Sequence, residues 1–421
     1  MAATDREIEV WIDLMGDNRR VGTLHSTLQR GRNLVRFEYD PSWMQSSVAF
    51  ALEPRLPLVQ GPQYPDGGYA LFPVFTDAAP DRWGRYLIAR AEQYAAEQEG
   101  RDPRALMDID YLVGLSDRHR MGALRFRDPG AETFLSASPE PIPPVARLRK
   151  LQEAARHLES DRETAEDIRL LLAPGSSLGG ARPKAVVVDE RGDEWIAKFE
   201  RAQDPRPIPR WEALTARLAH EARIHTPDIQ IIEIDQRGIF LSRRFDRTRN
   251  SEGRVPYVSA MTLCGKRDGE EASYIEIAQA IRQHGGAVQE DLEQLWRRMV
   301  FNVLVRNTDD HLRNHGFLWS REEGWRLAPA FDMNPTPPEE GAPVHALALD
   351  DRGDRSCSMD PVRRSAGHFG VSTPAARQIE DDVRQALSRW SEHASSFGLS
   401  ASECRRMEGV LPQSMQRRKP R

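Results

Sequence analysis

The stretch NTDDHLRNHGF, residues 307–317, contains two adjacent aspartates, an asparagine and two histidines that could bind a metal or move a proton. Transfer of a phosphoryl group needs an aspartate that orients the attacking hydroxyl or accepts its proton, and oxygen ligands that hold magnesium against the phosphates. Loops that catalyse this reaction separate the two groups by the spacing D-x-x-x-x-N. Asp309 and Asn314 have this spacing and Asp310 does not. The stretch therefore favours Asp309 as a catalytic base and Asn314 as a magnesium ligand.

A further aspartate that could bind the same metal follows in LAPAFDM, where Asp332 comes after an apolar run that is typical of a strand. A carboxylate here and an amide oxygen at Asn314 suit a small cation that keeps several of its waters. Two other interpretations remain open. His311 and His315 are four residues apart and could bind zinc, although no cysteine or third histidine lies close by in the sequence. Asp and Asn are also common in turns, so the stretch could be a polar turn.

A glycine-rich turn, PGSSLGGARPKAVVV, precedes a strand-like run and ends at Lys184. Glycine lets backbone N–H groups approach phosphates closely, so this turn could cover a nucleotide. It is not a Walker A loop, because Gly180 is not followed by Lys and then Ser or Thr. A purely structural turn is the alternative.

A second lysine, Lys198, lies in the apolar run WIAKF. A lysine in such a run needs an anionic partner, and the phosphates of ATP would serve. A side chain that extends from the strand to solvent is the alternative. On the next predicted helix, Glu212 could pair with Lys198, and Glu221 competes with it for this role.

Composition restricts the class of protein. The chain has 421 residues and a net charge of −5, so nothing predicts nucleic-acid binding by the whole chain. Its three cysteines are widely spaced, which excludes a disulfide framework and suits a reducing, cytoplasmic environment. We expect no signal peptide, because the first residues lack a basic segment followed by an apolar one. No apolar run is long enough to predict a transmembrane helix.

The first part of the chain, residues 1–127, is predicted to be a strand-rich domain. EIEVWIDL and GRNLVRFEYD alternate between apolar and polar residues, MGALRFRD forms a closing strand, and PDRWGRYLIARAEQYAAEQE has helical periodicity. Prolines and small residues at 128–145 indicate a linker. Residues 1–127 contain no phosphate-loop or metal-ligand pattern, so we expect this domain to dock a partner rather than to form part of the active site.

The remainder of the chain places strands before helices. Residues 146–255 begin with two helical segments and continue with a hairpin around RGD, an amphipathic helix and two more strands. Residues 256–400 are mostly helical and carry the NTDDHLRNHGF stretch with a hairpin after it, and residues 401–421 form a tail with a basic end. The predicted class is therefore α+β, with a strand-rich N-terminal docking domain followed by a two-lobed kinase-like fold whose C-terminal lobe is largely helical.

Taken together and in order, SSLGGARPK, WIAKF, RRFDR, NTDDHLRN and LAPAFDM resemble the motifs of HipA-type serine/threonine kinases, the toxins of bacterial HipBA toxin–antitoxin modules. Upstream, VGTLHS, FEYDPSWM, APDRWGRYLI and MGALRF resemble the N-terminal domain of that family, so the resemblance covers nearly the whole chain. It implies ATP and Mg²⁺ as cofactors, with Asp309 as the base and Asn314 and Asp332 as magnesium ligands. It also implies autophosphorylation of Ser177, beside which Ser176 is a second candidate.

The resemblance further implies a set of ATP-binding residues: the loop Gly179, Gly180, Ala181, Arg182, Pro183 and Lys184, the phosphate lysine Lys198, the adenine-facing hinge Arg243, Arg244 and Phe245, and His311, Leu312 and Arg313 beside the nucleotide. Arg243 departs from the family pattern, because the founding members have an acidic residue at this position.

The same resemblance implies a small helix-turn-helix antitoxin as partner, operator DNA bound mainly through that antitoxin, and a protein substrate such as an aminoacyl-tRNA synthetase. Its phosphorylation would halt translation and produce dormancy and persistence. Two alternatives are kept. D-x-H-x-x-N also resembles the catalytic loop of phosphoinositide kinases, which indicates a small-molecule or lipid kinase, although the N-terminal domain argues against it. A catalytically inactive co-repressor is the other, and the complete set of catalytic residues argues against it.

Overall fold

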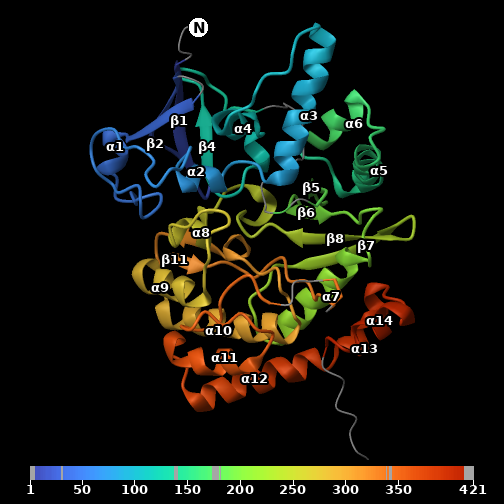
Figure 1. Ribbon diagram of the computed structural model, residues 1–421. Helices are drawn as coiled ribbons and strands as arrows, with labels where there is room; N and C mark the ends of the chain where they lie inside the picture. The colour runs from blue at the N-terminus through green and yellow to red at the C-terminus, as the bar shows by residue number, and fades with distance from the viewer. Residues whose placement is uncertain are drawn as a thin grey trace, which may run out of the picture. The chain divides into compact units, whose positions relative to one another are not determined.

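The structure, a computed structural model, describes residues 5–29, 32–136, 141–172, 180, 182–337, 339–340 and 344–411 (Figure 1). The chain forms two compact units. The first unit comprises Met1–Ala202, Arg243–Val258 and Leu318–Arg321, and the second comprises Gln203–Ser242, Ser259–Phe317 and Glu322–Arg421.

The first unit begins with an antiparallel sheet whose strands are β1 (Asp5–Leu14), β2 (Asp17–Gln29), β3 (Arg32–Tyr39) and β4 (Leu124–Arg127), in the order β3-β2-β1-β4. Alternate residues of β1, Ile8, Val10 and Ile12, are fully buried, as expected for a strand with one face on a core. Gly22 on β2 is required by close packing, because a Cβ there would collide with the carbonyl oxygen of Glu38.

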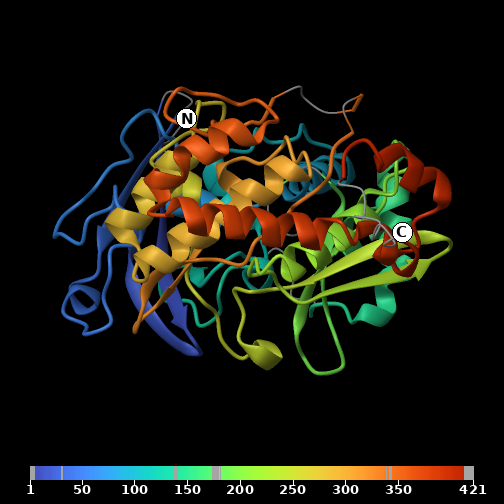
Figure 2. The ribbon, with the colours of Figure 1, turned by 90° about the horizontal axis from the view of Figure 1, so that it is seen from below.

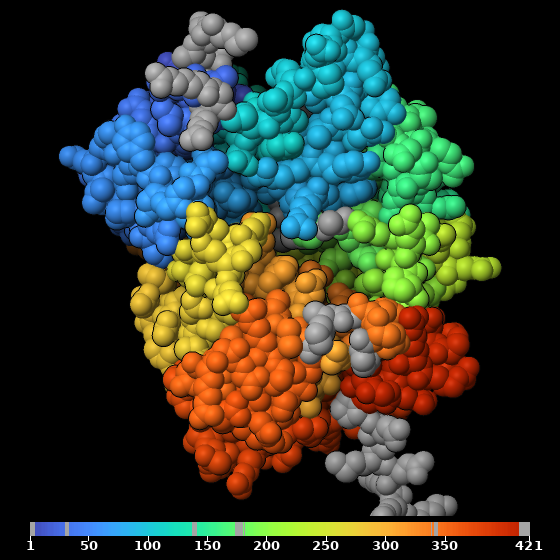
Figure 3. Space-filling model, in the orientation of Figure 1, coloured from blue at the N-terminus to red at the C-terminus, as the bar shows by residue number. Residues whose placement is uncertain are grey.

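The helices of the first unit follow the sheet and also separate its third and fourth strands. They are α1 (Pro41–Met44), α2 (Pro73–Asp77), α3 (Arg82–Glu99), α4 (Asp108–Gly114), α5 (Leu148–Glu159) and α6 (Ala165–Leu172), with 3-10 turns η1 (Asp117–His119), η2 (Val145–Arg147) and η3 (Arg249–Ser251). Helix α6 packs against both α3 and α5, and the far end of α3 stands out from the surface of its unit (Figure 3).

A hairpin and one aromatic contact complete the first unit. Strands β5 (Lys184–Val188) and β6 (Glu194–Lys198) pair antiparallel. Trp319, on β10 (Gly316–Ser320), stacks on Phe50 with ring centroids 3.9 Å apart. A late segment of the chain is thereby part of the first unit.

The second unit is largely helical. Its helices are α7 (Ile208–Glu221), α8 (Ala260–Leu263), α9 (Tyr274–His284), α10 (Val288–Leu304), α11 (Met359–Ser365), α12 (Thr373–Leu387), α13 (Trp390–Ala394) and α14 (Ala401–Met407), with 3-10 turns η4 (Leu312–Asn314), η5 (Ala366–Phe369) and η6 (Ser395–Phe397). Its remaining strands are β7 (Ile229–Ile234), β8 (Arg237–Arg243) and β11 (Gly324–Leu327), and β9 (Tyr257–Ser259) precedes α8.

Helix α10 forms the centre of the second unit. Trp296, Met299 and Phe301 are fully buried on it, and it packs against α9 and the long helix α12, as Figure 2 shows from below. The turn between β7 and β8 has positive φ at both Asp235 and Gln236, the geometry of a tight hairpin turn. The expected α+β class, with a strand-rich N-terminal region and a helical C-terminal region, is confirmed. Within the described ranges, no helix combines the length and the apolar character needed to cross a membrane.

Candidate active site

The two adjacent aspartates of the NTDDHLRNHGF stretch have opposite environments. This stretch follows the end of α10 and includes the 3-10 turn η4. Asp309 is exposed to solvent, whereas Asp310 is only 4% exposed. Only the first of the two carboxylates can therefore meet a substrate without movement of the loop.

One oxygen of the Asp310 carboxylate, Oδ2, anchors the loop to two helices. It accepts hydrogen bonds from Tyr274 Oη on α9, Asn302 Nδ2 on α10 at 2.9 Å, and His315 Nε2 at 3.0 Å. Burial opposes ionisation of this carboxyl, but the charge of His315 and the hydrogen bonds from His315 and Tyr274 lower its pKa. Asp310 is thus an ionised, buried anchor that joins the two ends of the loop.

Asn314 lies in the same loop and is 6% exposed. Its side-chain nitrogen donates to the carbonyl oxygen of Asp309 at 3.3 Å, and its backbone N–H donates to the carbonyl oxygen of His311 at 2.9 Å. With the amide nitrogen engaged, the side-chain oxygen is the atom that can bind a cation. The loop therefore holds the predicted base and the predicted metal ligand in a fixed relation.

Asp332 follows β11 and has a backbone φ of 59°, in the left-handed region that few residues other than glycine adopt. Two backbone hydrogen bonds hold the segment before it. The N–H of Ala330 donates to the carbonyl oxygen of His225 at 2.7 Å, and the N–H of Ala328 donates to that of Gly316 at 2.8 Å. Unusual backbone conformations of this kind concentrate at functional sites. The geometry supports a specific role for the Asp332 carboxylate.

The donors available for a metal fit magnesium better than zinc. No group of three or more His, Cys, Asp or Glu side chains that could hold a metal ion occurs among the described residues. The Nε2 atom of His315 is hydrogen-bonded to Asp310, which argues against the zinc interpretation. Magnesium needs only one or two protein oxygens when phosphate oxygens and waters complete its shell. The amide of Asn314 and the carboxylate of Asp332 match this requirement.

The predicted phosphate-binding residues lie in the first unit. Lys184 and Lys198 stand directly opposite each other on β5 and β6. Lys184 is almost fully buried and forms an ion pair with Asp81 at 2.7 Å, while Lys198 is half-buried. Arg182 Nη1 donates to the carbonyl oxygen of Phe199 at 3.4 Å. Ser176, Ser177, Gly179 and Ala181 lie outside the described residues.

One residue of the proposed hinge, Arg244, has a buried side chain that forms ion pairs inside the protein. Arg244 is fully buried, and its guanidinium pairs with Asp246 at 2.7 Å and with Glu194 at 3.2 Å. Although burial opposes its charge, these two carboxylates raise the pKa of Arg244. Its side chain is therefore committed to the interior, so any contact of Arg244 with adenine would come from its backbone. Arg243 and Phe245 are half-buried.

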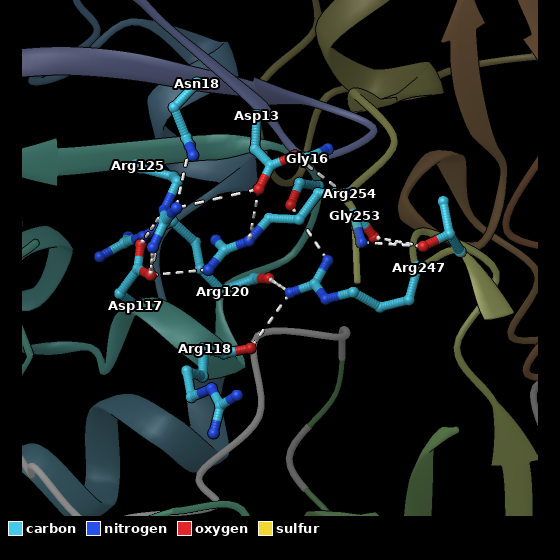
Figure 4. A network of polar contacts seen from close by, with 12 residues as sticks. Asp13, Gly16, Asn18, Asp117, Arg118, Arg120, Arg125, Arg247, Gly253 and Arg254 are labelled. Carbon is cyan, nitrogen blue, oxygen red and sulfur yellow. Dashed lines mark hydrogen bonds and ion pairs between the residues drawn. The ribbon is translucent and has the colours of Figure 1, made fainter. Parts of the chain in front are cut away.

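A network of buried charges extends from this hinge to the N-terminal sheet (Figure 4). Arg247 donates to the carbonyl oxygens of Arg118 and Arg120 at 3.1 and 2.7 Å. Arg254 pairs with Asp117 at 2.6 Å. Burial opposes ionisation of Asp117, but Arg254 and Arg125 lower its pKa. Arg247 of the RRFDR motif and Arg254 beyond it therefore hold the 117–122 segment of the N-terminal domain in place.

Three acidic residues of these contacts were not predicted as functional: Asp81, Asp117 and Asp246. Asp246 lies within RRFDR and Asp81 within APDRWGRYLI, so the motifs that carry the family resemblance could have marked both aspartates as candidate functional residues. Glu212 is buried on α7, whereas its competitor Glu221 is engaged in ion pairs with Arg217 and Arg389 at 2.9 Å each. The pairing of Glu212 with Lys198 stays a prediction.

The fold and the loop together define a kinase-like protein with an added N-terminal domain. Residues 176–390 match the family model of the HipA-like C-terminal domain, and residues 11–127 match that of the HipA N-terminal domain. The chain therefore belongs to the HipA family, as the resemblance of its motifs indicated.

Three known proteins illustrate the similarity. A Haemophilus influenzae protein named "Putative kinase" is 24% identical over 231 residues, which are 49% of this chain and 65% of that protein. Toxin YjjJ of Escherichia coli is 26% identical over 171 residues, 38% of each chain. The matches thus span less than two thirds of these relatives. HipA of Shewanella oneidensis MR-1, solved with HipB and operator DNA, shares the fold with a TM-score of 0.68 at 16% identity, over 96% of this chain and 94% of that chain.

Proposed function

We propose that this protein is an ATP- and Mg²⁺-dependent serine/threonine protein kinase that acts as the toxin of a toxin–antitoxin pair. The observation that carries the proposal is the division of roles in the loop, where a buried Asp310 anchors an exposed Asp309 next to Asn314. This arrangement provides a base that can reach a hydroxyl and an amide oxygen that can bind a metal. Membership of the HipA family supports the same activity.

The chemistry assigns one task to each side chain. Asp309 orients the hydroxyl of the substrate serine or threonine and accepts its proton as the new P–O bond forms and the bond to the leaving ADP breaks. Asn314 and Asp332 would hold magnesium, which neutralises phosphate charge. Lys198 supplies a further positive charge from β6. We place the protein in the cytoplasm, where ATP and the translation machinery are found.

The partners follow from family membership as part of the proposal. HipA of Shewanella oneidensis was solved with HipB and operator DNA. A HipB-like helix-turn-helix antitoxin would bind this protein and supply most of the contact with operator DNA, which suits the net charge of −5. The substrate would be a translation component such as an aminoacyl-tRNA synthetase.

The alternatives make different predictions. A small-molecule or lipid kinase would leave the proteome unmodified, and an inactive co-repressor would transfer no phosphate at all. The deciding experiment is quantitative phosphoproteomics after expression of the wild type and of Asp309→Ala in a bacterial host. We expect new phosphoserine or phosphothreonine on one or a few proteins with the wild type only. Identical phosphoproteomes would contradict the proposed function. A short adjacent gene for a helix-turn-helix protein would support the toxin assignment.

A further inference from the structure

A buried ion pair joins the N-terminal domain to the exit of the glycine-rich turn. Lys184 Nζ lies 2.7 Å from Asp81 Oδ2, and the two side chains are 1% and 4% exposed. Lys184 is the first residue of β5, directly after the turn, and Asp81 directly precedes α3. The pair therefore links two segments that are about a hundred residues apart in the sequence.

Further contacts fix both members of the pair. The other carboxylate oxygen of Asp81 accepts the N–H of Gly84 at 2.8 Å and so caps the 18-residue helix α3. The indole nitrogen of Trp83 donates to the backbone carbonyl of Lys184 at 3.0 Å. The first turn of α3 thus holds Lys184 by its side chain and by its backbone.

The pair also affects the second lysine of the hairpin. Lys184 and Lys198 are direct cross-strand partners, and like charges in this position destabilise a strand pair. The Asp81 carboxylate neutralises the ammonium of Lys184 and reduces this repulsion. Gly180, in the turn, has a φ of 99°, and a Cβ there would lie 3.4 Å from Lys184 Nζ. Gly180 therefore lies next to the ion pair.

We propose that Asp81 and Lys184 form a positioning pair, through which the N-terminal domain fixes the exit of the glycine-rich turn and the strand pair that carries Lys198. This replaces the role that the family resemblance implies for Lys184: its buried side chain acts through Asp81 and is not a ligand of the phosphates. This inference rests on the proposed function, because it concerns how the nucleotide-binding turn is placed. It gives the N-terminal domain a part in nucleotide binding without any contact between Asp81 and the nucleotide.

A double-mutant cycle on the full-length chain tests the pair, with Asp81→Asn, Lys184→Met and the double variant. Asparagine still caps α3, and methionine keeps most of the volume of lysine. Each single change breaks the buried ion pair but keeps one of its two charges, so we expect a lower Tm and an affinity for ATP–Mg²⁺ that is weaker by about tenfold to a hundredfold. The double variant buries neither charge, and we expect both its Tm and its ATP affinity to return close to wild type.

The ATP affinity of the double variant decides between the two roles of Lys184. A folded double variant that binds ATP as weakly as Lys184→Met would show that Lys184 contacts the nucleotide, and would overturn the proposal. If a single variant does not fold, the double variant is compared with wild type directly. The matched control is Asp108→Asn, which breaks a more exposed pair with Arg85 on the same helix α3 and should change neither readout.

Failure of the proposed function would be recognised separately. A wild-type protein that binds no ATP would contradict the proposed kinase, whereas the thermal part of the cycle would still report on the pair. Additive changes in Tm for the two substitutions would show that Asp81 and Lys184 are not coupled, and would overturn the inference whatever the activity.

Discussion

At the scale of single residues, the neighbouring carboxylates Asp309 and Asp310 show how position decides function. The spacing to Asn314 was enough to favour Asp309 from the sequence, because the chemistry requires that separation. The anchoring role of Asp310 could not be predicted, since two of its three donors, Tyr274 and Asn302, come from helices whose packing the sequence does not specify. Burial, and not residue type, separates the two roles.

Asp309→Asn and Asp310→Asn should therefore fail in different ways. We expect Asp309→Asn to lose at least about a hundredfold in phosphotransfer, while nucleotide binding and Tm stay near wild type, because only the proton acceptor is removed. Asp310→Asn should lose about 3 kcal/mol of stability, because the buried network loses its charge. Phosphotransfer assays and differential scanning calorimetry measure the two effects. Near-normal turnover by Asp309→Asn would make Asp310 the next candidate base.

Asp332→Ala should uncouple magnesium from nucleotide binding. The carboxylate is the predicted anionic metal ligand of the protein, so its loss removes the extra affinity that Mg²⁺ gives to ATP. Isothermal titration with ATP, in the presence of Mg²⁺ and of EDTA, compares wild type with the variant. Asp309→Asn serves as the control, which should keep the magnesium effect. A full magnesium effect in Asp332→Ala would exclude this ligand.

Glu53 should make the protein less stable as the pH rises. It is 1% exposed, and burial, together with the charge of Asp77, raises its pKa from 4.5 to about 8 against the opposing hydrogen bond from Val74. Between these values the folded state keeps a proton that the unfolded state has lost, so stability falls by up to about 1.4 kcal/mol per pH unit. Denaturant unfolding at pH 5, 6, 7 and 8 should show this slope in wild type, and Glu53→Gln should reduce it. If the stability of wild type and of Glu53→Gln changed equally with pH, the pH dependence would come from groups other than Glu53.

At the scale of elements, the sequence predicted helices and strands that have a periodic apolar pattern. It did not predict elements whose conformation depends on pairing with neighbouring strands. Helix α10 and the β5–β6 hairpin are close to their expected positions, because a continuous apolar stripe or a tight turn marks them. Strand β2 was not assigned as an element, since DNRRVGTLHSTLQ carries few apolar residues and owes its conformation to pairing with β1 and β3. The buried partners of Lys184 and Arg254 also escaped prediction, because they lie more than a hundred residues away.

The glycine-rich turn is the element in which we expect self-inhibition. Phosphate on Ser177 would add roughly −1.5 to −2 charges, which would repel the phosphates of ATP and compete for nearby cations such as Arg182. Intact-mass and phosphosite analysis after incubation with ATP and Mg²⁺ should find phosphate on wild-type Ser177 and none on Asp309→Ala. Ser177→Ala is the matched control. Phosphate on Ser176 alone would show that Ser176, and not Ser177, is the self-inhibitory phosphorylation site. An active protein without phosphate on either serine would refute the prediction.

At the scale of the whole molecule, the N-terminal domain is built into the first unit together with the β5–β6 hairpin and the RRFDR segment. The sequence predicts that this domain docks a partner, which stays a prediction. However, its carboxylates and carbonyl groups also satisfy Lys184, Arg247 and Arg254 inside the protein. Docking therefore has to be tested on the intact chain, for example by hydrogen exchange with and without the antitoxin.

A truncated protein that begins at Ala146 should fail to fold cooperatively. It would lack Asp81 and Asp117 and, with them, most of the residues of the first unit, so the buried ion pairs of Lys184 and Arg254 and much of the apolar core of this unit would be lost. Such losses approach the entire stability of a typical domain. Thermal unfolding followed by circular dichroism, with the full chain as control, measures this directly. A sharp transition in the truncated protein would show that the buried network is dispensable.

The three separate segments of the first unit also impose an order of events during synthesis on the ribosome. Met1–Ala202 is made first, but Arg243–Val258 and Leu318–Arg321 follow only later. At bacterial elongation rates, the interval between Ala202 and Arg321 lasts on the order of ten seconds. Within that interval the chain adds, in order, Arg244 as a partner of Glu194, Arg254 as a second arginine partner of Asp117, and Trp319 as the partner of Phe50. Asp332 is made after the last of these segments, so all three segments of the first unit are present before the set of predicted catalytic and metal-binding residues is complete.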